Sequence, residues 1–547
     1  MKPAIQKFHS SLEKIDAFSG MHAPELGEIT GLWGETVSFQ ITCTFDRDYH
    51  DDSYGILSVE APGCQAEVFL VEGAACSYPC YPDSTGAYLT KVPGLIPDIL
   101  NPYHGTPVRI SSGICRVFWV DIAIPAGAQS GSVTVQLRDR RGNLQSCEQL
   151  RLEVVGQELP KQQVRHTEWF YNDCLCQQYG CRMYSDRFFE IARGYIAMAA
   201  AHGMDTLLTP VFTPSLDIEP DCRRMPGQLV KITRGPEGWG FDFALLERWV
   251  RMAQECGIEY FEIAPFFTQW GARCPAEIYE QTPEGEKTIL GWGDPATGEA
   301  YGAFLADFLP KLIGELKRLG IKEKTYFHVS DEPTLEQLDN YRAAREMIVP
   351  YLEGCPVIDA LSSFQFYQQG LVSIPVVAEN HLEPFLAERG AGEIWTYSCC
   401  SQHQLVPNFF MAMPSSRGRI LGVLLYQEDL KGFLRWGYNF WNSQYSKEAV
   451  DPYRVTDAGY GFPSGDSFLV YPGADGTPVP SIRLKVMRDA FQDYRALQLL
   501  QERLGRDGVI DWLRQTLGEL SFTSYPTDAE ALPAMRKALH EQLKKGN

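Results

Sequence analysis

Eight short apolar segments recur between residues 166 and 441. This repetition limits the possible folds of the chain more than any other feature of the sequence. They read as buried strands and cover residues 166–173, 204–212, 258–267, 324–332, 356–364, 374–380, 393–400 and 432–441. Amphipathic segments that end at a glycine separate several of them, at residues 185–203, 241–257 and 300–320. Ser185 or Asp186 is the expected N-cap of the first helix. The pattern predicts an α/β fold, a (β/α)8 TIM-type barrel, with a doubly wound parallel sheet as the structural alternative.

The first 160 residues have a different pattern. Runs that alternate apolar and polar residues, such as "ETVSFQITCTF" and "GSVTVQLRD", are separated by Gly, Pro, Asp and Asn. This is typical of an antiparallel β-sandwich, which we expect to end at the polar linker "GQELPKQQ". We therefore predict three units: an N-terminal sandwich over 1–160, the barrel over 161–505 with its last helix at 481–505, and a peripheral helical C-terminal tail over 506–547.

Charge and cysteine content restrict the partners and the compartment. The net charge of −20 at pH 7 argues against nucleic acid or an anionic membrane as the main partner, because no basic stripe is present to displace counterions. The first twenty residues lack the apolar core of a signal peptide, and no run of about 18 apolar residues occurs. Fifteen irregularly spaced cysteines fit reduced thiols, so we expect a cytoplasmic protein without a membrane segment. The oligomeric state stays unknown.

Aromatic and polar side chains gather at the predicted C-terminal ends of the strands, which form the active-site mouth of a barrel. The residues that we expect to line this mouth are Trp169, Asp173, Trp270, Tyr397, Trp436, Asn439 and Trp441. Aromatic residues make up 12% of the chain, and their rings suit sugars because the C–H faces of sugars stack on them. For any single ring, packing in a large core is the alternative.

The stretch "YFHVSDEPT" carries two adjacent carboxylates, Asp331 and Glu332. Neighbouring residues of a strand point to opposite faces, so both can serve one site only where the strand ends, and Pro333 is the expected end. Two nearby carboxyls resist simultaneous ionisation, and a protonated acid beside an anion is what cleavage of a glycosidic bond needs. The alternative is that Asp331 caps the next helix while Glu332 is solvated.

A metal site has less support. His328 with the two carboxylates offers ligands, but a strand places His328 and Asp331 on opposite faces. The cysteines of "CLCQQYGC" lack a second pair at zinc-site spacing. We therefore expect no metal and no cofactor.

Taken together, the motifs resemble glycoside hydrolase family 123, the β-N-acetylgalactosaminidases, and the wider set called domain of unknown function 4091. The matching segments occur in consistent order over residues 165–495 and are "HTEWFYNDCL", "LLTPVFTP", "TQWGA", "FHVSDEP", "WTYSCC", "PNFF", "GFLRWGYNFW", "GDSFLVYPG" and "SIRLKVMRDAFQDY". One position departs from the pattern, since Tyr171 stands where His is expected in many relatives.

The resemblance implies an exo-acting, retaining enzyme that removes β-linked N-acetylgalactosamine (GalNAc) from a glycan or glycoconjugate. In such enzymes the sugar's own 2-acetamido oxygen attacks the anomeric carbon and forms an oxazoline intermediate. On that template Glu332 is the acid and base, Asp331 orients the acetamido group, and His328 joins the residues of the mouth as a substrate-binding residue. Two alternatives stay open: a glycosidase of this fold that acts on another sugar, and a carbohydrate-binding protein without catalysis.

Overall fold

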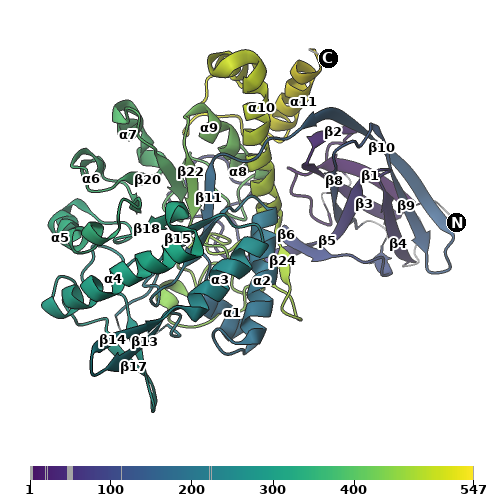
Figure 1. The fold of residues 1–547 in the computed structure, drawn as a ribbon. Coiled ribbons are helices and arrows are strands. Elements are labelled where there is room, and N and C mark those ends of the chain that lie inside the picture. The colour runs from purple at the N-terminus through teal and green to yellow at the C-terminus, as the bar shows by residue number, and fades with distance from the viewer. Residues whose placement is uncertain are drawn as a thin grey trace.

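The computed structural model has two lobes (Figure 1). Strands from the N-terminal part of the chain form one lobe, and parallel strands with their helices form the other. Helix α10 (Ile482–Leu517) lies where the two lobes meet. The structure describes residues 4–18, 20, 22–45, 53–111, 114–220, 222 and 224–545.

Two five-stranded sheets build the N-terminal lobe. The first has the order β1 (Ala4–Ser10), β3 (Glu35–Phe45), β8 (Arg116–Ile124), β5 (Gln65–Cys76) and β6 (Gly94–Pro102). The second has the order β2 (Glu28–Trp33), β10 (Leu144–Glu158), β9 (Gly131–Asp139), β4 (Ser53–Glu60) and β7 (Val108–Ile110). Apolar side chains of both sheets, among them Phe39, Phe118, Leu57 and Val135, share one core. The pairing is antiparallel except between β2 and β10, which are far apart in sequence and run parallel.

The second lobe is a nearly closed barrel of eight parallel strands. Their order is β18 (Thr325–Phe327), β15 (Tyr260–Ile263), β12 (Thr206–Thr209), β11 (Arg165–Glu168), β22 (Gly432–Arg435), β21 (Trp395–Ser398), β20 (Ile374–Ala378) and β19 (Ile358–Leu361). A parallel bridge between Phe327 and Val357 joins the two end strands, which an open doubly wound sheet leaves apart. Each predicted strand overlaps one of these, but the observed strands are shorter. The predicted strand 324–332 ends at Phe327, so Pro333 does not end it.

Helices surround the barrel and connect its strands. They are α1 (Asn172–Tyr179), α2 (Asp186–Ala201), α3 (Ala244–Glu255), α4 (Glu299–Leu319), α5 (Leu338–Ile348), α6 (Phe364–Gln368), α7 (Leu382–Glu388), α8 (Ser415–Arg419) and α9 (Leu421–Gln427). Ser185 is the N-cap of α2, since its hydroxyl accepts the N–H of Phe188. Gly320 ends α4 in the left-handed conformation, at φ +72°. In the part of the chain that the structure describes, no helix is long and apolar enough to span a membrane.

Small sheets in the loops were not expected from the sequence. The strands β14 (Gly238–Asp242), β13 (Lys231–Gly235), β16 (Ile278–Thr282) and β17 (Gly285–Leu290) form a four-stranded sheet, and β23 (Val470–Pro472) pairs with β24 (Pro478–Pro480). Glycine turns at "GPEG" and "PEGE" close the two hairpins of the larger sheet. Strands β13, β14 and β17 are largely exposed, so they lack the buried apolar runs by which the barrel strands were found.

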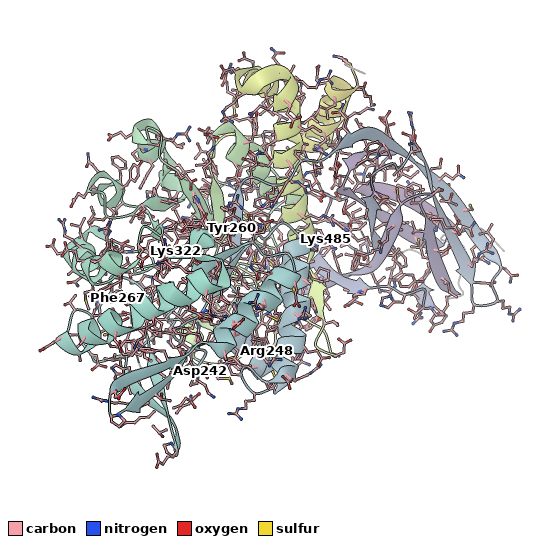
Figure 2. The ribbon with its side chains drawn as sticks, in the orientation of Figure 1. Asp242, Arg248, Tyr260, Phe267, Lys322 and Lys485 are labelled. Atoms are coloured by element: carbon pink, nitrogen blue, oxygen red, sulfur yellow. The ribbon has the colours of Figure 1, made fainter. Side chains whose placement is uncertain are left out.

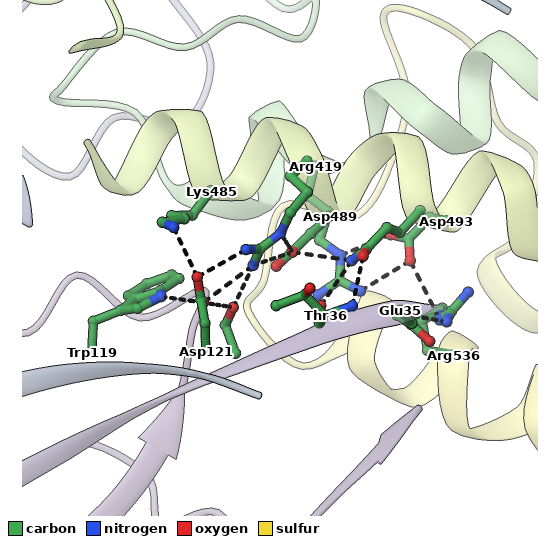
Figure 3. Close-up of polar contacts among 12 residues, drawn as sticks. Glu35, Thr36, Trp119, Asp121, Arg419, Lys485, Asp489, Asp493 and Arg536 are labelled. Atoms are coloured by element: carbon green, nitrogen blue, oxygen red, sulfur yellow. Dashed lines mark hydrogen bonds and ion pairs between the residues drawn. The ribbon is translucent and has the colours of Figure 1, made fainter. Parts of the chain in front are cut away.

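Buried ion pairs attach the barrel lobe to the sandwich (Figure 3). Asp121 of β8 pairs with Lys485 at 2.8 Å and with Arg488 at 2.9 Å, both on α10. Lys485 lies at the junction of the lobes (Figure 2). Arg536, on the last helix α11 (Ala531–Lys544), pairs with Glu35 of β3 at 2.5 Å. The helical tail was predicted correctly, but its peripheral position is wrong, because this helix is buried between the lobes through Leu532, Met535, Arg536, Leu539 and His540.

Replacement of Arg536 by Ala should lower the free energy of unfolding by about 3–5 kcal/mol, because it leaves the buried carboxylate of Glu35 without its partner. Urea unfolding followed by tryptophan fluorescence measures the change. The neighbouring Lys537 pairs with Glu28 on the surface, so Lys537→Ala is the matched control and should leave the urea midpoint near that of the wild type. Equal effects of both substitutions would contradict a dominant role for the buried pair.

Candidate active site

The two adjacent carboxylates lie beyond the C-terminal end of β18, where the backbone changes direction between them. Glu332 has φ +46°, in the left-handed region that costs a residue with a side chain roughly 1–2 kcal/mol. Its N–H donates to the carbonyl of Ala360 at 3.0 Å, and the N–H of Trp270 donates to the carbonyl of Asp331 at 3.0 Å. Pro333 disfavours the right-handed helical conformation at Glu332. Contacts from β19 and from the loop after β15 thus hold a turn that brings both side chains to one pocket.

The helix-capping alternative for Asp331 does not hold. The following 3₁₀ turn, Leu335–Gln337, begins with a capping box formed by Thr334 and Gln337. Asp331 instead accepts a hydrogen bond from the side-chain amide of Gln269 at 2.5 Å. Its carboxylate therefore belongs to the pocket and not to a helix terminus.

Eighteen residues line the pocket, the carboxylate pair included. The lining comprises Trp169, Tyr171, Leu216, Asp217, Gln269, Trp270, Asp331, Glu332, Ala360, Tyr397, Cys399, Cys400, Ser401, Leu434, Trp436, Gln444, Tyr445 and Phe462. It encloses about 750 Å³ between protein atoms when its open mouth is included, and about 180 Å³ of this admits water-sized molecules. Six of the residues that the sequence predicted for the site meet here.

Comparison with known proteins decides the family. Residues 169–500 match the glycoside hydrolase 123 catalytic domain. The chain belongs to glycoside hydrolase family 123. It is therefore a glycoside hydrolase, and its carboxylate pair lies inside the matched region.

A solved structure of another family 123 enzyme agrees with this chain at the level of fold. A family 123 glycoside hydrolase from Clostridium perfringens, described in a study of glycolipid glycan hydrolysis, is 14% identical and has a TM-score of 0.75 over 99% of this chain and 98% of its own. A family 5 mannosidase from Rhizomucor miehei is 9% identical and has a TM-score of only 0.33 over 63% of this chain and 95% of its own. No curated protein matches the chain in sequence.

Both carboxyls of this family 123 enzyme have raised pKa values. Burial raises the pKa of Asp331 well above its ordinary value, and the charge of Glu332 raises it further. Burial also raises the pKa of Glu332, while hydrogen bonds from Tyr397 and Trp270 oppose the shift. The Tyr397 hydroxyl donates to Oε1 of Glu332 at 2.7 Å. The pair therefore retains a proton to a higher pH than two isolated carboxyls would.

The two carboxyls differ in access to the pocket. Asp331 is buried, with 4% of its surface exposed, whereas Glu332 is partly exposed. A ligand that enters from solvent can therefore reach the carboxyl of Glu332, whereas the carboxyl of Asp331 faces the deeper part of the pocket. The geometry offers one buried acceptor and one accessible acid or base within a single pocket.

His328 lies beneath the pocket and does not line it. Its Nε2 lies 2.6 Å from Glu262 and its Nδ1 lies 2.9 Å from Asp359, on the strands at either side of β18. Burial alone lowers the pKa of His328, but the two carboxylates outweigh it and raise the pKa to about 10. At neutral pH His328 is therefore a buried cation. Both ring nitrogens are engaged, so this side chain has none left for a metal, and no group of three His, Cys, Asp or Glu among the described residues is arranged to hold a metal ion.

Glu262 and Asp466 orient two tryptophans of the pocket. The indole N–H of Trp169 donates to Glu262 at 2.7 Å, which links the pocket wall to the buried cation. The indole N–H of Trp436 donates to Asp466 at 2.9 Å. Burial raises the pKa of Asp466 to about 6. These hydrogen bonds fix the ring orientations, which a surface for sugar faces requires.

Three other predicted side chains lie outside the lining. Asp173 pairs with Arg224 at 3.1 Å, and Trp441, only 2% exposed, donates to the carbonyl of Val470 at 3.2 Å. Asn439 is fully buried and bonds the backbone N–H and carbonyl of a pocket residue, Tyr171, at 2.9 and 3.0 Å. Their predicted direct contact with substrate is not supported by this placement, since each side chain is engaged within the protein.

Several lining residues were missed by the sequence reasoning. Gln269 directly precedes Trp270 in "TQWGA", so its polar side chain at a strand end was a usable signal. Asp217, Tyr445 and Phe462 come from long loops without periodicity, where no local pattern indicates which side chains turn inward. Their place in the pocket depends on tertiary contacts.

Replacement of Asp331 by Asn should raise the free energy of unfolding at pH 8 by about 0.5–2 kcal/mol. The folded-state pKa of Asp331 lies above its unfolded value, so the wild type loses stability as the pH rises through the folded-state pKa, and the neutral amide avoids that loss. At pH 4 the gain should vanish because the wild-type carboxyl is then protonated. Urea unfolding at both pH values measures the difference.

The control for this comparison is Asp507→Asn, which changes an exposed carboxylate far along the chain from the pocket. It should shift stability little at either pH. A gain for Asp331→Asn that is equal at pH 4 and pH 8 would show that burial of charge is not its cause.

Proposed function

We propose that this family 123 enzyme is an exo-acting, retaining hydrolase that removes terminal β-linked GalNAc by substrate-assisted catalysis. The observation that carries the proposal is the adjacency of Asp331 and Glu332 at one wall of the pocket, one buried and one accessible. A retaining enzyme that uses its own nucleophile needs two carboxyls about 5–5.5 Å apart on opposite faces of the sugar ring. Consecutive residues on the same wall suit a reaction in which the substrate supplies the nucleophile.

In the proposed first step, the acetamido carbonyl oxygen of the sugar attacks the anomeric carbon. The glycosidic bond breaks, and its electron pair leaves with the departing oxygen, which takes the proton of Glu332. Asp331 accepts the acetamido N–H and stabilises the positive charge of the oxazoline ring. In the second step, anionic Glu332 removes a proton from water, which attacks the anomeric carbon and restores the acetamido group. Two inversions leave the configuration unchanged.

The proton of the pair moves with substrate binding in this scheme. In the protein alone, burial raises the pKa of both carboxyls, and Asp331 is the more deeply buried of the two, so the shared proton favours that residue. An acetamido N–H that donates to Asp331 stabilises the anion and lowers its pKa. The proton then favours Glu332, where the leaving group needs it. Binding of the correct sugar thereby sets the protonation state for the first step.

Substrate and compartment are further parts of the proposal. The related Clostridium perfringens enzyme was studied for hydrolysis of glycolipid glycans, which supports a glycan as the substrate class. All fifteen cysteines are free in the structure, which supports a reducing compartment such as the cytoplasm. No nucleic acid or membrane partner is proposed.

Replacement of Glu332 by Gln should lower the rate about 10²–10⁴-fold on a GalNAc disaccharide, because its leaving group needs a proton. The loss should be smaller on an aryl glycoside with a good leaving group. Initial rates on both substrates measure it, with the stability change of the variant recorded in parallel. Full activity of the variant on the disaccharide would refute the assignment of the acid.

A second candidate is a glycosidase of the same fold that acts on another sugar and uses Asp217 as an enzyme nucleophile. Asp217 is the third carboxylate of the pocket lining, which favours this candidate. Against it, one oxygen of Asp217 already accepts the N–H of Tyr445 at 3.0 Å. The candidates differ in their need for the 2-acetamido group.

A panel of p-nitrophenyl β-glycosides of GalNAc, N-acetylglucosamine and galactose separates them. We expect the galactoside, which lacks the 2-acetamido group, to be cleaved at least about 10³-fold more slowly than the GalNAc glycoside, because it offers no internal nucleophile. NMR of the first-released anomer should show the β configuration. Equal cleavage of galactoside and GalNAc glycoside would exclude substrate assistance.

A further inference from the structure

Three sulfur atoms meet at the C-terminal end of helix α1, and none of them lines the candidate active site. The thiol of Cys176 lies 3.7 Å from the thioether sulfur of Met183, and the thiol of Cys181 lies 3.8 Å from that of Cys176. All three belong to the segment "CLCQQYGCRM", of which the proposed reaction makes no use. Cys176 is buried, whereas Cys181 and Met183 are partly exposed. The cluster is therefore anchored in the core and has access to solvent.

The end of the helix brings the two cysteines together. Gly180 follows α1 in the left-handed conformation, at φ +59°, and the N–H of Cys181 donates to the carbonyl of Cys176 at 3.2 Å. This hydrogen bond closes a Schellman-type helix end, in which the second residue past the helix packs against the last helical turn. The local backbone thus places the two thiols side by side.

The separations between the sulfur atoms suit a single metal ion. Metal–thiolate bonds are about 2.3 Å long, which places two ligands about 3.8 Å apart around a tetrahedral ion and about 4.0 Å apart around a trigonal planar one. The observed separations of 3.7 and 3.8 Å are close to both values. An ion between the three sulfurs would therefore require only small movements of the side chains.

The ligand set selects the kind of ion. Thiolates and thioethers are soft ligands, which favour copper(I). A structural zinc site needs four ligands from Cys, His, Asp and Glu, and the described residues hold no group of even three that is arranged around an ion. The segment was set aside in the sequence analysis for this reason, because only zinc-site spacing was considered there. A copper(I) ion with two thiolates and one thioether does not need the missing ligands.

Cys174 is not a further ligand of this cluster. It lies two positions before Cys176 on α1, and side chains at that spacing do not face each other. Its sulfur accepts the backbone N–H of Trp441 at 3.4 Å and the side-chain amide of Asn442 at 3.5 Å. The cluster therefore offers three sulfur ligands.

We propose that Cys176, Cys181 and Met183 form a copper(I) site that fastens the end of α1 to the loop that leads to α2. Binding replaces the proton of each thiol by a bond to the ion, so two protons pass to solvent and no electron is transferred. Burial raises the pKa of the Cys176 thiol, so that this proton leaves only for an ion that bonds strongly to sulfur. The site is separate from the carboxylate pair, and the inference does not rest on the proposed function.

The wild-type protein should retain about one equivalent of copper(I) against bicinchoninate, a chelator that removes copper(I) from isolated thiols. The reduced protein is titrated anaerobically with copper(I) and separated from the chelator by gel filtration, and its copper content is measured by mass spectrometry. Cys176→Ser should retain almost none, because the central ligand is lost. Met183→Leu keeps the shape of the side chain without its sulfur and should weaken binding at least about 10-fold.

Cys355→Ser and Met347→Leu are the matched controls, because both residues are partly buried and lie at or near α5, away from the cluster. Both should retain copper as the wild type does. X-ray absorption at the copper edge should show three sulfur neighbours in the wild type and two in Met183→Leu. If Cys176→Ser does not fold, the conservative Met183→Leu decides. No retention by the wild type, retention by Met183→Leu that equals the wild type, or only two sulfur neighbours in the wild type would refute the site.

Discussion

Two carboxylates at consecutive positions reach one pocket only if the backbone between them leaves the extended path, and the rest of the site depends on that turn. Glu332 occupies the left-handed region with Pro333 behind it, and its N–H is fixed by the carbonyl of Ala360 on β19. From the other side, the N–H of Trp270 fixes the carbonyl of Asp331. The strain is local, but the hydrogen bonds that hold it come from β19 and from the loop after β15, so the assembled barrel keeps both carboxyls directed at the same pocket.

A buried cation beneath the pocket partly offsets the negative charge of the Asp331 and Glu332 pair. His328 is a buried cation between Glu262 and Asp359, and it opposes the effect of burial on Asp331 by lowering that pKa. Three of these four groups are carboxyls, and the imidazolium is the one cation among them. The Trp169 indole is hydrogen-bonded to the same Glu262, which ties the pocket wall to this network. The same contacts therefore determine the charge beneath the pocket and the orientation of the Trp169 ring.

The sequence predicted most of the barrel because buried parallel strands are continuous apolar runs, and it predicted the carboxylate pair because adjacency at a strand end is a local signal. Asn439 and Trp441 were predicted to line the mouth because the last strand was expected to extend to residue 441. Strand β22 ends six residues earlier, at Arg435, and the side chains of Asn439 and Trp441 are buried in the core. Tyr445 could not be predicted as a pocket residue from the sequence. A hydrogen bond to Asp217, more than 200 residues away, positions its loop, and no periodicity in the sequence indicates that contact.

The two lobes act as one unit at the site, although the family match covers only residues 169–500. The sandwich loop between β5 and β6 lies against the barrel loops, where Ser464 donates its N–H to the carbonyl of Tyr78 at 2.7 Å. From the same loop, the hydroxyl of Tyr81 hydrogen-bonds to Cys400, which lines the pocket. Part of the pocket wall is thus supported by the N-terminal lobe. Because the ion pairs along α10 and α11 fix the position of that lobe, they act on the shape of the pocket as well as on stability.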